Sequence, residues 1–184
     1  RMLGPAHFFD NEVGGSAHGE EKGGLTPFGE RAIDRMQELG FLVDLAHASP
    51  AVFEDVLARW RSPAIVSHAG VQATCPGPRN LSDAQLRALA AGGGLVGIGF
   101  FEGAVCDITP DGIARAIRHV ADTVGVEHVA LGSDWDGATR VVVDPAHLVH
   151  LTDALLRAGF DDDEVIAVMG RNAQRVLRAG LPEE

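Results

Sequence analysis

The sequence predicts an α/β protein of the TIM-type (β/α)8 barrel class, built on a parallel sheet. Short runs rich in β-branched residues alternate along the chain with segments whose apolar residues recur at helical spacing. Each predicted strand is apolar on both faces, which is typical of a parallel sheet covered by helices. Four polar residues, His7, His47, His68 and Asp134, each follow directly on one of these strands.

The predicted elements follow one another along the whole chain, which we treat as a single domain over residues 1–184. Strands are expected at residues 2–4, 41–45, 64–66, 95–100 and 129–131. Helices are expected to begin at Thr26, Ser49, Ser82, Thr109, Asp144 and Asp161, whose side chains can cap a first turn. Gln85 and Glu164 stand where they would complete capping boxes.

The polar residues at the strand ends distinguish a barrel from an open doubly wound sheet. In a barrel the carboxyl ends of the strands form one ring, so these side chains would face a common centre. An open sheet would spread them along a line, and no Gly-x-Gly-x-x-Gly turn for a nucleotide follows a predicted strand. We therefore predict a barrel.

Only about five of the eight strands of such a barrel are accounted for. We expect the chain to hold the last five strands and the C-terminal helices, with the front strands missing. Because unpaired parallel edges are unfavourable in a soluble protein, the rest is expected to come from elsewhere. The sequence begins at Arg1 rather than Met, and we expect the true N-terminus to lie upstream.

The composition is that of a globular protein with an acidic surface. Hydrophobic residues make up 46% and charged residues 22%, and the formal net charge is −11. Phosphate backbones should repel a chain this acidic, so we expect no nucleic acid partner. No apolar run is long enough to span a bilayer, so we expect no transmembrane segment.

His47 and His68 are the first candidate site residues. A single histidine after a strand is more often a hydrogen-bonded structural residue than a ligand. Two at the ends of consecutive barrel strands would reach one ion, and zinc favours imidazole nitrogen. We therefore predict both to be metal ligands. Asp44 could orient an imidazole, although its position in the strand is equally consistent with facing a helix.

Asp134 and Arg79 are the next candidates, each with a simpler interpretation. Asp134 lies in residues 132–137 (GSDWDG), a composition common in turns. At a strand end it would point at a metal-bound water and shuttle protons, with Asp136 bracing the loop. Arg79 is either a solvated loop arginine or a fork that clamps a ligand carboxylate.

An ordered set of short motifs runs along nearly the whole chain. They are residues 24–29 (GLTPFG), 39–49 (LGFLVDLAHAS), 67–68 (SH), 79–83 (RNLSD), 93–97 (GGLVG), 132–137 (GSDWDG) and 170–172 (GRN). Each motif alone is weak, whereas the order and spacing of the set are specific. Together they resemble the membrane (renal-type) dipeptidase family of binuclear zinc peptidases.

The resemblance implies a complete enzyme that hydrolyses dipeptides with a hydroxide activated by two zinc ions. His47 and His68 match the two histidines that hold one zinc, and Asp134 matches the aspartate proposed to handle protons. Arg79 matches the arginine that recognises the substrate carboxylate. His7, whose flanking residues diverge from the family, matches the histidine near the scissile carbonyl, where it would stabilise an oxyanion.

The chain departs from the family in the front half of the site. The His-x-Asp pair of the first strand and the metal-bridging glutamate of the third are absent, which leaves ligands for one zinc. Because stable zinc sites use three or four protein ligands, we expect the isolated chain to be inactive.

Two alternatives stay open. The missing ligands are consistent with a non-catalytic remnant or structural half-barrel, although retention of all four matched side chains argues against it. Another metal-dependent amidohydrolase, such as a lactonase, deaminase or phosphoesterase, would share strand-end histidines. Such sites often add a lysine after a strand, and Lys22 lies in a glycine-rich loop instead.

Cys75 and Cys106 leave the cellular compartment open. Composition alone favours two free thiols in a cytoplasmic protein. In some members of the resembling family, notably secreted ones, a disulfide occupies these positions, which would place the chain outside the cytoplasm. A homodimer is considered as the assembly, whereas the sequence leaves the dipeptide preference and the oligomeric state open.

Overall fold

Five short parallel strands form the centre of the computed structural model, which describes residues 1–136 and 138–181. They are β1 (Met2–Leu3), β2 (Leu42–Val43), β3 (Ile65–Ala69), β4 (Leu95–Ile98) and β5 (Val129–Leu131). β1 pairs with β2, and β3, β4 and β5 pair in sequence order. Within the described ranges, a single parallel bridge between Asp44 and Ile65 joins the two groups. Gly137 of the GSDWDG motif lies outside the described residues.

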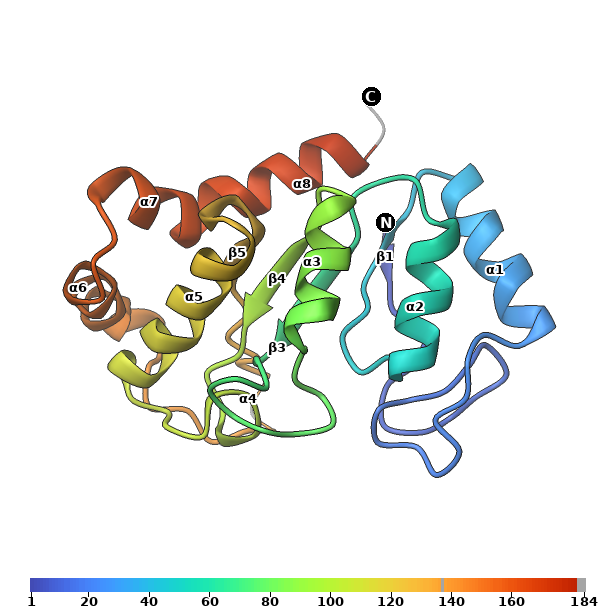
Figure 1. The fold of residues 1–184 in the computed structure, drawn as a ribbon, viewed down its shortest axis with the longest axis horizontal. Helices are drawn as coiled ribbons and strands as arrows, with labels where there is room; N and C mark the ends of the chain where they lie inside the picture. The colour runs from blue at the N-terminus through green and yellow to red at the C-terminus, as the bar shows by residue number, and fades with distance from the viewer. Residues whose placement is uncertain (137, 182–184) are drawn as a thin grey trace.

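Helices connect the strands and complete the C-terminal part of the chain (Figure 1). They are α1 (Pro27–Glu38), α2 (Pro50–Arg59), α3 (Asp83–Ala91), α4 (Glu102–Val105), α5 (Pro110–Val124), α6 (Leu148–Arg157), α7 (Asp162–Ile166) and α8 (Asn172–Gly180). Short 3-10 turns, η1 (Val126–His128) and η2 (Pro145–His147), and a π-helical turn, η3 (Ala167–Arg171), lie between them.

Five of the six predicted caps open an α-helix as expected. The side chains of Thr26, Ser49, Ser82, Thr109 and Asp161 each accept a hydrogen bond from the first turn. Both predicted capping boxes are formed. Asp144 instead caps the 3-10 turn η2, which leads into α6. α4 and α8 are not among the predicted elements.

The two faces of the sheet are covered differently. Alternate strand residues, such as Val43, Val66 and Val96, join the large core under α1, α2, α3, α5 and α6. The residues between them, such as Leu42 and Leu95, form a smaller cluster with Val176 of α8. Figure 1 shows α8 running across the end opposite the α4 loops. Because α8 covers the amino ends of the strands, their carboxyl ends are the ones left open to form a cavity.

The strand order bears on the choice between a barrel and an open doubly wound sheet. A doubly wound sheet reverses its order at a switch point, whereas these strands follow one another in sequence. An α/β fold with a parallel sheet is therefore confirmed. Closure of eight strands into a barrel stays a prediction.

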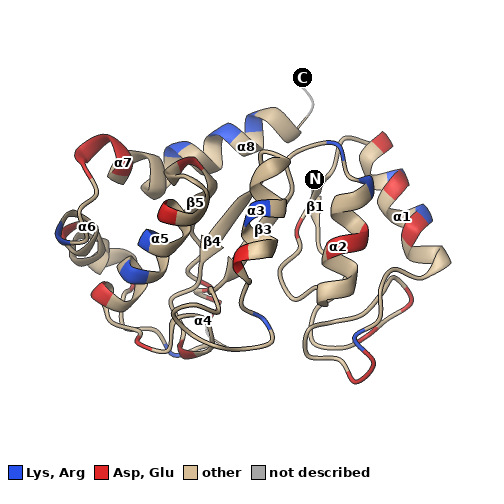
Figure 2. Ribbon diagram, in the orientation of Figure 1, with Lys and Arg blue, Asp and Glu red and all other residues tan. Residues whose placement is uncertain are grey.

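Charge is distributed over the outer helices. Figure 2 shows acidic residues gathered on α7 and recurring on α1 and α2, with basic residues along α8. No helix within residues 1–136 and 138–181 combines the length and hydrophobicity that a membrane crossing requires.

We expect Ile117→Ala to lower the free energy of unfolding by about 2–5 kcal/mol, because the side chain in α5 is fully buried and its loss leaves a cavity. Urea unfolding followed by circular dichroism measures this change. Ile166→Ala is the matched control, since Ile166 is 58% exposed and should shift stability by about 0.5 kcal/mol or less. Equal effects of the two changes would contradict the assigned core.

Candidate active site

A cavity of about 610 Å³ opens at the carboxyl ends of the strands. Its lining includes all five residues that the sequence analysis selected, namely His7, His47, His68, Arg79 and Asp134. These residues come from separate strand ends and loops, and the fold brings them together. Their chemical roles stay predictions.

The imidazoles of His47 and His68 face each other across the centre of this cavity. Their Nε2 atoms are 3.0 Å apart. His47 follows β2 in a left-handed backbone conformation, with φ at 65°, which is uncommon for a residue with a side chain. The carbonyl of His47 accepts a hydrogen bond of 2.8 Å from Ala17 N, which ties this turn to the glycine-rich loop.

A β-bulge places His68. The register between β3 and β4 passes from Val66–Val96 to Ala69–Ile98, so β3 holds one extra residue at this point. In a regular strand, the side chains of Ser67 and His68 would point to opposite faces of the sheet. The bulge breaks this alternation and allows His68 to line the cavity. The Ser67 hydroxyl lies 2.9 Å from Nδ1 of His68 and fixes the ring.

The imidazole pair fits two positions of a zinc site. Two nitrogens bound tetrahedrally to one zinc at about 2.05 Å are about 3.3 Å apart, so the observed 3.0 Å requires little adjustment. Nδ1 of His47 is buried without a hydrogen-bond partner in the described part of the chain. No group of three or more His, Cys, Asp or Glu residues that could hold a metal occurs within residues 1–136 and 138–181. His47 and His68 therefore stay predicted metal ligands, and the described residues add no further His, Cys, Asp or Glu that completes a metal site with them.

Both imidazoles are held in the neutral form that binds metal. Burial lowers the pKa of His47 to about 3, and the positive charge of Arg79 acts in the same direction. Burial and Arg79 also lower the pKa of His68, opposed by the carboxylates of Asp134 and Asp44. Neutral rings keep a nitrogen lone pair free near neutral pH.

Asp134 stands beside the pair after β5. Its Oδ1 lies 3.8 Å from Nε2 of His68, and its φ is 60°, the second left-handed backbone in the site. Its loop is held by the indole of Trp135, which donates to Val143 O at 2.9 Å. Asp136 accepts a hydrogen bond from Ala138 N at 2.8 Å, consistent with the predicted bracing role.

Arg79 reaches the cavity from the loop after β3. Its Nη2 donates to the carbonyl of His68 at 2.9 Å, and its guanidinium carbon lies 5.9 Å from the ring centre of Phe101. Burial lowers its pKa, and Asp134 opposes that shift. Nε of Arg79 is buried with no partner among the described residues. The group is therefore partly desolvated and retains donor capacity, as an anion clamp requires.

The Arg79 loop is fastened to α4 in two ways. Cys75 and Cys106 form a disulfide, so the bridge that the sequence left open is present. Asn80, 3% exposed, donates to the carbonyls of Cys75, Gly103 and Ala104 and accepts from Gly70 N. These bonds fix the backbone beside Arg79.

The glycine-rich loop contributes residues that the sequence analysis missed. His18 lines the cavity, and the centre of its ring lies 5.6 Å from that of His47. The ring centre of His7 lies 4.2 Å from that of His47. Ser16, fully buried, donates to the carbonyl of His7. A histidine among small residues (GGSAHG) in a loop between strand and helix was the available signal.

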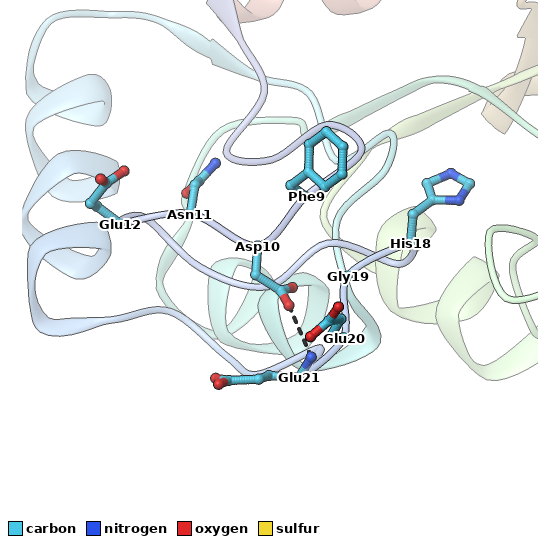
Figure 3. A pocket seen from close by; sticks show the side chains of 8 residues that line it. All are labelled: Phe9, Asp10, Asn11, Glu12, His18, Gly19, Glu20 and Glu21. Atoms are coloured by element: carbon cyan, nitrogen blue, oxygen red, sulfur yellow. Dashed lines mark hydrogen bonds between the residues drawn. The ribbon is translucent and has the colours of Figure 1, made fainter.

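A second, acidic hollow of about 640 Å³ adjoins the first through His18. Figure 3 shows His18 at one end of it and Glu12 at the other. The carboxylate of Asp10 accepts hydrogen bonds from Glu21 N and Ser16 N, which lower the pKa of Asp10. Asp10 thus holds the loop closed.

Asp44 lines the cavity but does not bond to an imidazole, so the orienting contact considered above is not formed in the described residues. Its carboxylate bonds to backbone N–H groups instead.

Comparisons with known proteins agree with the fold and identify the family. The sequence profile of the membrane dipeptidase family, peptidase family M19, matches residues 1–180. An uncharacterised Klebsiella pneumoniae protein, named for its position 5′ of pqqA, is 34% identical over 97% of this chain and 71% of its own length. Dipeptidase aclJ of Aspergillus oryzae is 34% identical over 96% of this chain and 44% of its own length.

Solved structures extend the comparison. A crystal structure of a metallopeptidase from Rhodobacter sphaeroides, liganded with a phosphinate mimic of the dipeptide L-Ala-D-Ala, matches with a TM-score of 0.86 at 28% identity. The match covers 98% of this chain and 56% of that one. The parallel α/β fold is therefore that of a class of metallopeptidases. The chain belongs to the membrane dipeptidase family, M19, as its motifs predict.

The pKa of His47 predicts how the metal-free chain loses stability in acid. An unfolded histidine has a pKa near 6.5. Between pH 6.5 and about pH 3, His47 is therefore protonated in the unfolded chain but neutral in the folded chain. Stability is therefore complete above pH 6.5 and falls as the pH drops through this window. Between pH 7 and 5 the loss attributable to His47 is up to about 2 kcal/mol.

Urea unfolding in a chelator at the two pH values checks this prediction. His47→Gln removes the titrating group and should lose less stability than the parent chain over the same interval. A parent and variant with the same pH dependence would contradict the low pKa.

We expect Asn80→Ala to lower the free energy of unfolding by about 3 kcal/mol, because it leaves several buried backbone groups unpaired. Asn11→Ala, which removes an exposed asparagine with comparable loop bonds, should cost about 1 kcal/mol or less. Thermal unfolding of both variants measures the difference. An Asn80→Ala chain as stable as its parent would overturn the fastening role of this side chain.

Proposed function

We propose that this chain supplies half of the active site of a zinc-dependent dipeptidase, within a complete eight-stranded barrel. The observation that carries the proposal is the approach of the two imidazole nitrogens to 3.0 Å in a cavity also lined by Arg79 and Asp134. Family membership supports a metal cofactor, because M19 enzymes are metallopeptidases. Imidazole ligands favour zinc.

The metal would be held by His47 and His68 together with ligands from outside this chain. When bound, zinc supplies a Lewis acid that polarises a carbonyl and lowers the pKa of water. A complete family site holds two zincs, and this chain retains ligands for one. Because two imidazoles fall short of a stable site, the isolated chain is inactive in this proposal.

Arg79 binds the free carboxylate of the substrate. Its guanidinium is partly desolvated and held in place by the His68 carbonyl and the Asn80 network. A charge-assisted bond gains strength in such surroundings, and a guanidinium matches a carboxylate in shape. This contact sets how far the scissile bond lies from the imidazole pair.

Asp134 and His7 act on the reacting groups. Asp134, 3.8 Å from His68 Nε2, accepts a proton from the attacking water and delivers it to the leaving amine. His7 lies against His47 on the other side and donates to the developing oxyanion. Its ring is exposed to the cavity, where a substrate carbonyl can reach it.

A dipeptide is the substrate that these positions favour. The carboxylate clamp and the reacting centre lie in one cavity of about 610 Å³, a size suited to a small molecule. The Rhodobacter sphaeroides relative is liganded with a mimic of L-Ala-D-Ala, which supports the same substrate class here. The Cys75–Cys106 disulfide favours an oxidising compartment.

The chain spans 44% of the length of the Aspergillus relative and 56% of the Rhodobacter one, so the activity of a whole enzyme is part of the proposal. The absence of a third metal ligand among the described residues favours one rival, a structural half-barrel without catalysis. A structural half-barrel is not expected to bind a dipeptide with a free carboxylate more tightly than the corresponding amide.

Binding of a dipeptide and of its C-terminal amide to the zinc-treated chain tests the proposal. We expect the free carboxylate to bind about tenfold more tightly, with the preference lost in Arg79→Met, since charge-assisted bonds contribute about 1.5–3 kcal/mol. Arg87→Met is the matched control, because Arg87 is exposed on α3. Chemical-shift titration reports both affinities. A preference that survives Arg79→Met would refute the clamp.

A further inference from the structure

Asp44 lies between the two imidazole-bearing strands. Its Oδ1 accepts one hydrogen bond from Ala46 N at 3.0 Å and a second from Ser67 N at 2.9 Å. Ala46 directly precedes His47, and Ser67 directly precedes His68. One oxygen atom therefore holds the backbone immediately before each candidate ligand.

These two bonds lie where the sheet has little else to hold it. β2 and β3 are joined by the single Asp44–Ile65 bridge and by Leu45 N donating to Ile65 O at 2.7 Å. The carbonyl of Leu45 accepts a hydrogen bond from Ala48 N at 3.2 Å, so it is used within the local turn rather than in pairing with β3. The N–H of Ser67 instead donates to the carboxylate of Asp44, which takes the place of a backbone carbonyl of β2.

Both imidazoles also start from irregular backbone. His47 has a left-handed φ of 65°, which costs a non-glycine residue about 1–2 kcal/mol, and His68 sits in a β-bulge. Neither conformation persists without local bonds that favour it. The bond from Ala46 N to Asp44 closes an Asx-type turn before His47, and the bond from Ser67 N anchors the bulge.

We propose that Asp44 is a positioning residue, which sets the separation of the His47 and His68 nitrogens by binding both strand ends through one acceptor oxygen. This inference rests on the proposed function, because the spacing matters for a metal held by both rings. The acceptor oxygen, rather than the negative charge, performs the role. Asparagine keeps such an oxygen, whereas alanine removes it.

The two substitutions therefore separate the acceptor from the charge. Asp44→Asn should retain both backbone bonds and bind Zn²⁺ within about twofold of the parent chain. Asp44→Ala should weaken Zn²⁺ binding by about tenfold or more, the usual effect of losing a residue that orients ligands. Asp55→Ala is the matched control, because Asp55 also accepts a backbone N–H, from Leu25 at 2.8 Å, away from the cavity.

Zinc chloride titrations of the whole chain, followed by the ring nitrogen resonances of His47 and His68, measure these affinities. The amide proton shifts of Ala46 and Ser67 give a second, metal-free readout, which should move in Asp44→Ala and stay in Asp44→Asn. Circular dichroism and thermal unfolding establish that each variant is folded. If Asp44→Ala does not fold, the Asp44→Asn titration and its amide shifts still decide.

Each outcome bears on one claim. Two imidazoles alone form a weak site, so the titration extends to a large excess of Zn²⁺. A parent chain whose His47 and His68 resonances do not respond even there would refute the proposed metal pair. A parent that responds, with a folded Asp44→Ala that binds equally well, would overturn the role of Asp44 alone. Loss of affinity in Asp44→Asn with its amide shifts retained would also overturn it, since the charge would then be the active feature.

Discussion

The approach of two neutral imidazoles to 3.0 Å is the interaction on which the rest of the site depends. Two rings this close cannot both be positively charged without strong repulsion, and burial and the nearby guanidinium of Arg79 favour their neutral forms. The cavity therefore concentrates nitrogen lone pairs beside the carboxylate of Asp134. Such a set is suited to a metal ion and to proton transfer next to it.

The scaffold around this pair combines regular and irregular parts. Sequential parallel strands bring the chain repeatedly to one edge, and α8 closes the other edge over a small apolar cluster. At the working edge, the left-handed turns at His47 and Asp134 and the bulge at His68 aim the side chains inward. Irregular backbone of this kind is concentrated at functional sites because the surrounding structure must hold it in place.

The regular parts are those that local chemistry predicts. Caps such as Ser82 and Asp161 act within four residues of their partners, so a short pattern was sufficient to place α3 and α7. The strand-end positions of the site residues followed from the same alternation. The bulge at His68 depends on pairing between separate strands, and the Asn80 network depends on α4, which lies beyond a whole strand and helix. Neither the bulge nor the Asn80 network leaves a short sequence pattern by which it could be predicted.

The disulfide and His18 illustrate the same limit. Two cysteines show that a bridge can form, whereas only the fold shows that Cys75 and Cys106 hold the Arg79 loop against α4. His18 reaches the cavity because residues 15–17 bond to the turn at residues 47–49. Non-local contacts thus decide which polar residues become part of the site.

X-ray absorption at the zinc edge tests the central claim most directly, on the chain mixed with less than one equivalent of Zn²⁺. The account predicts a nitrogen shell at about 2.0–2.1 Å with the outer-shell pattern of two imidazoles, reduced to one in His47→Gln and in His68→Gln. A spectrum of hydrated zinc, or an imidazole signal that neither substitution changes, would contradict it.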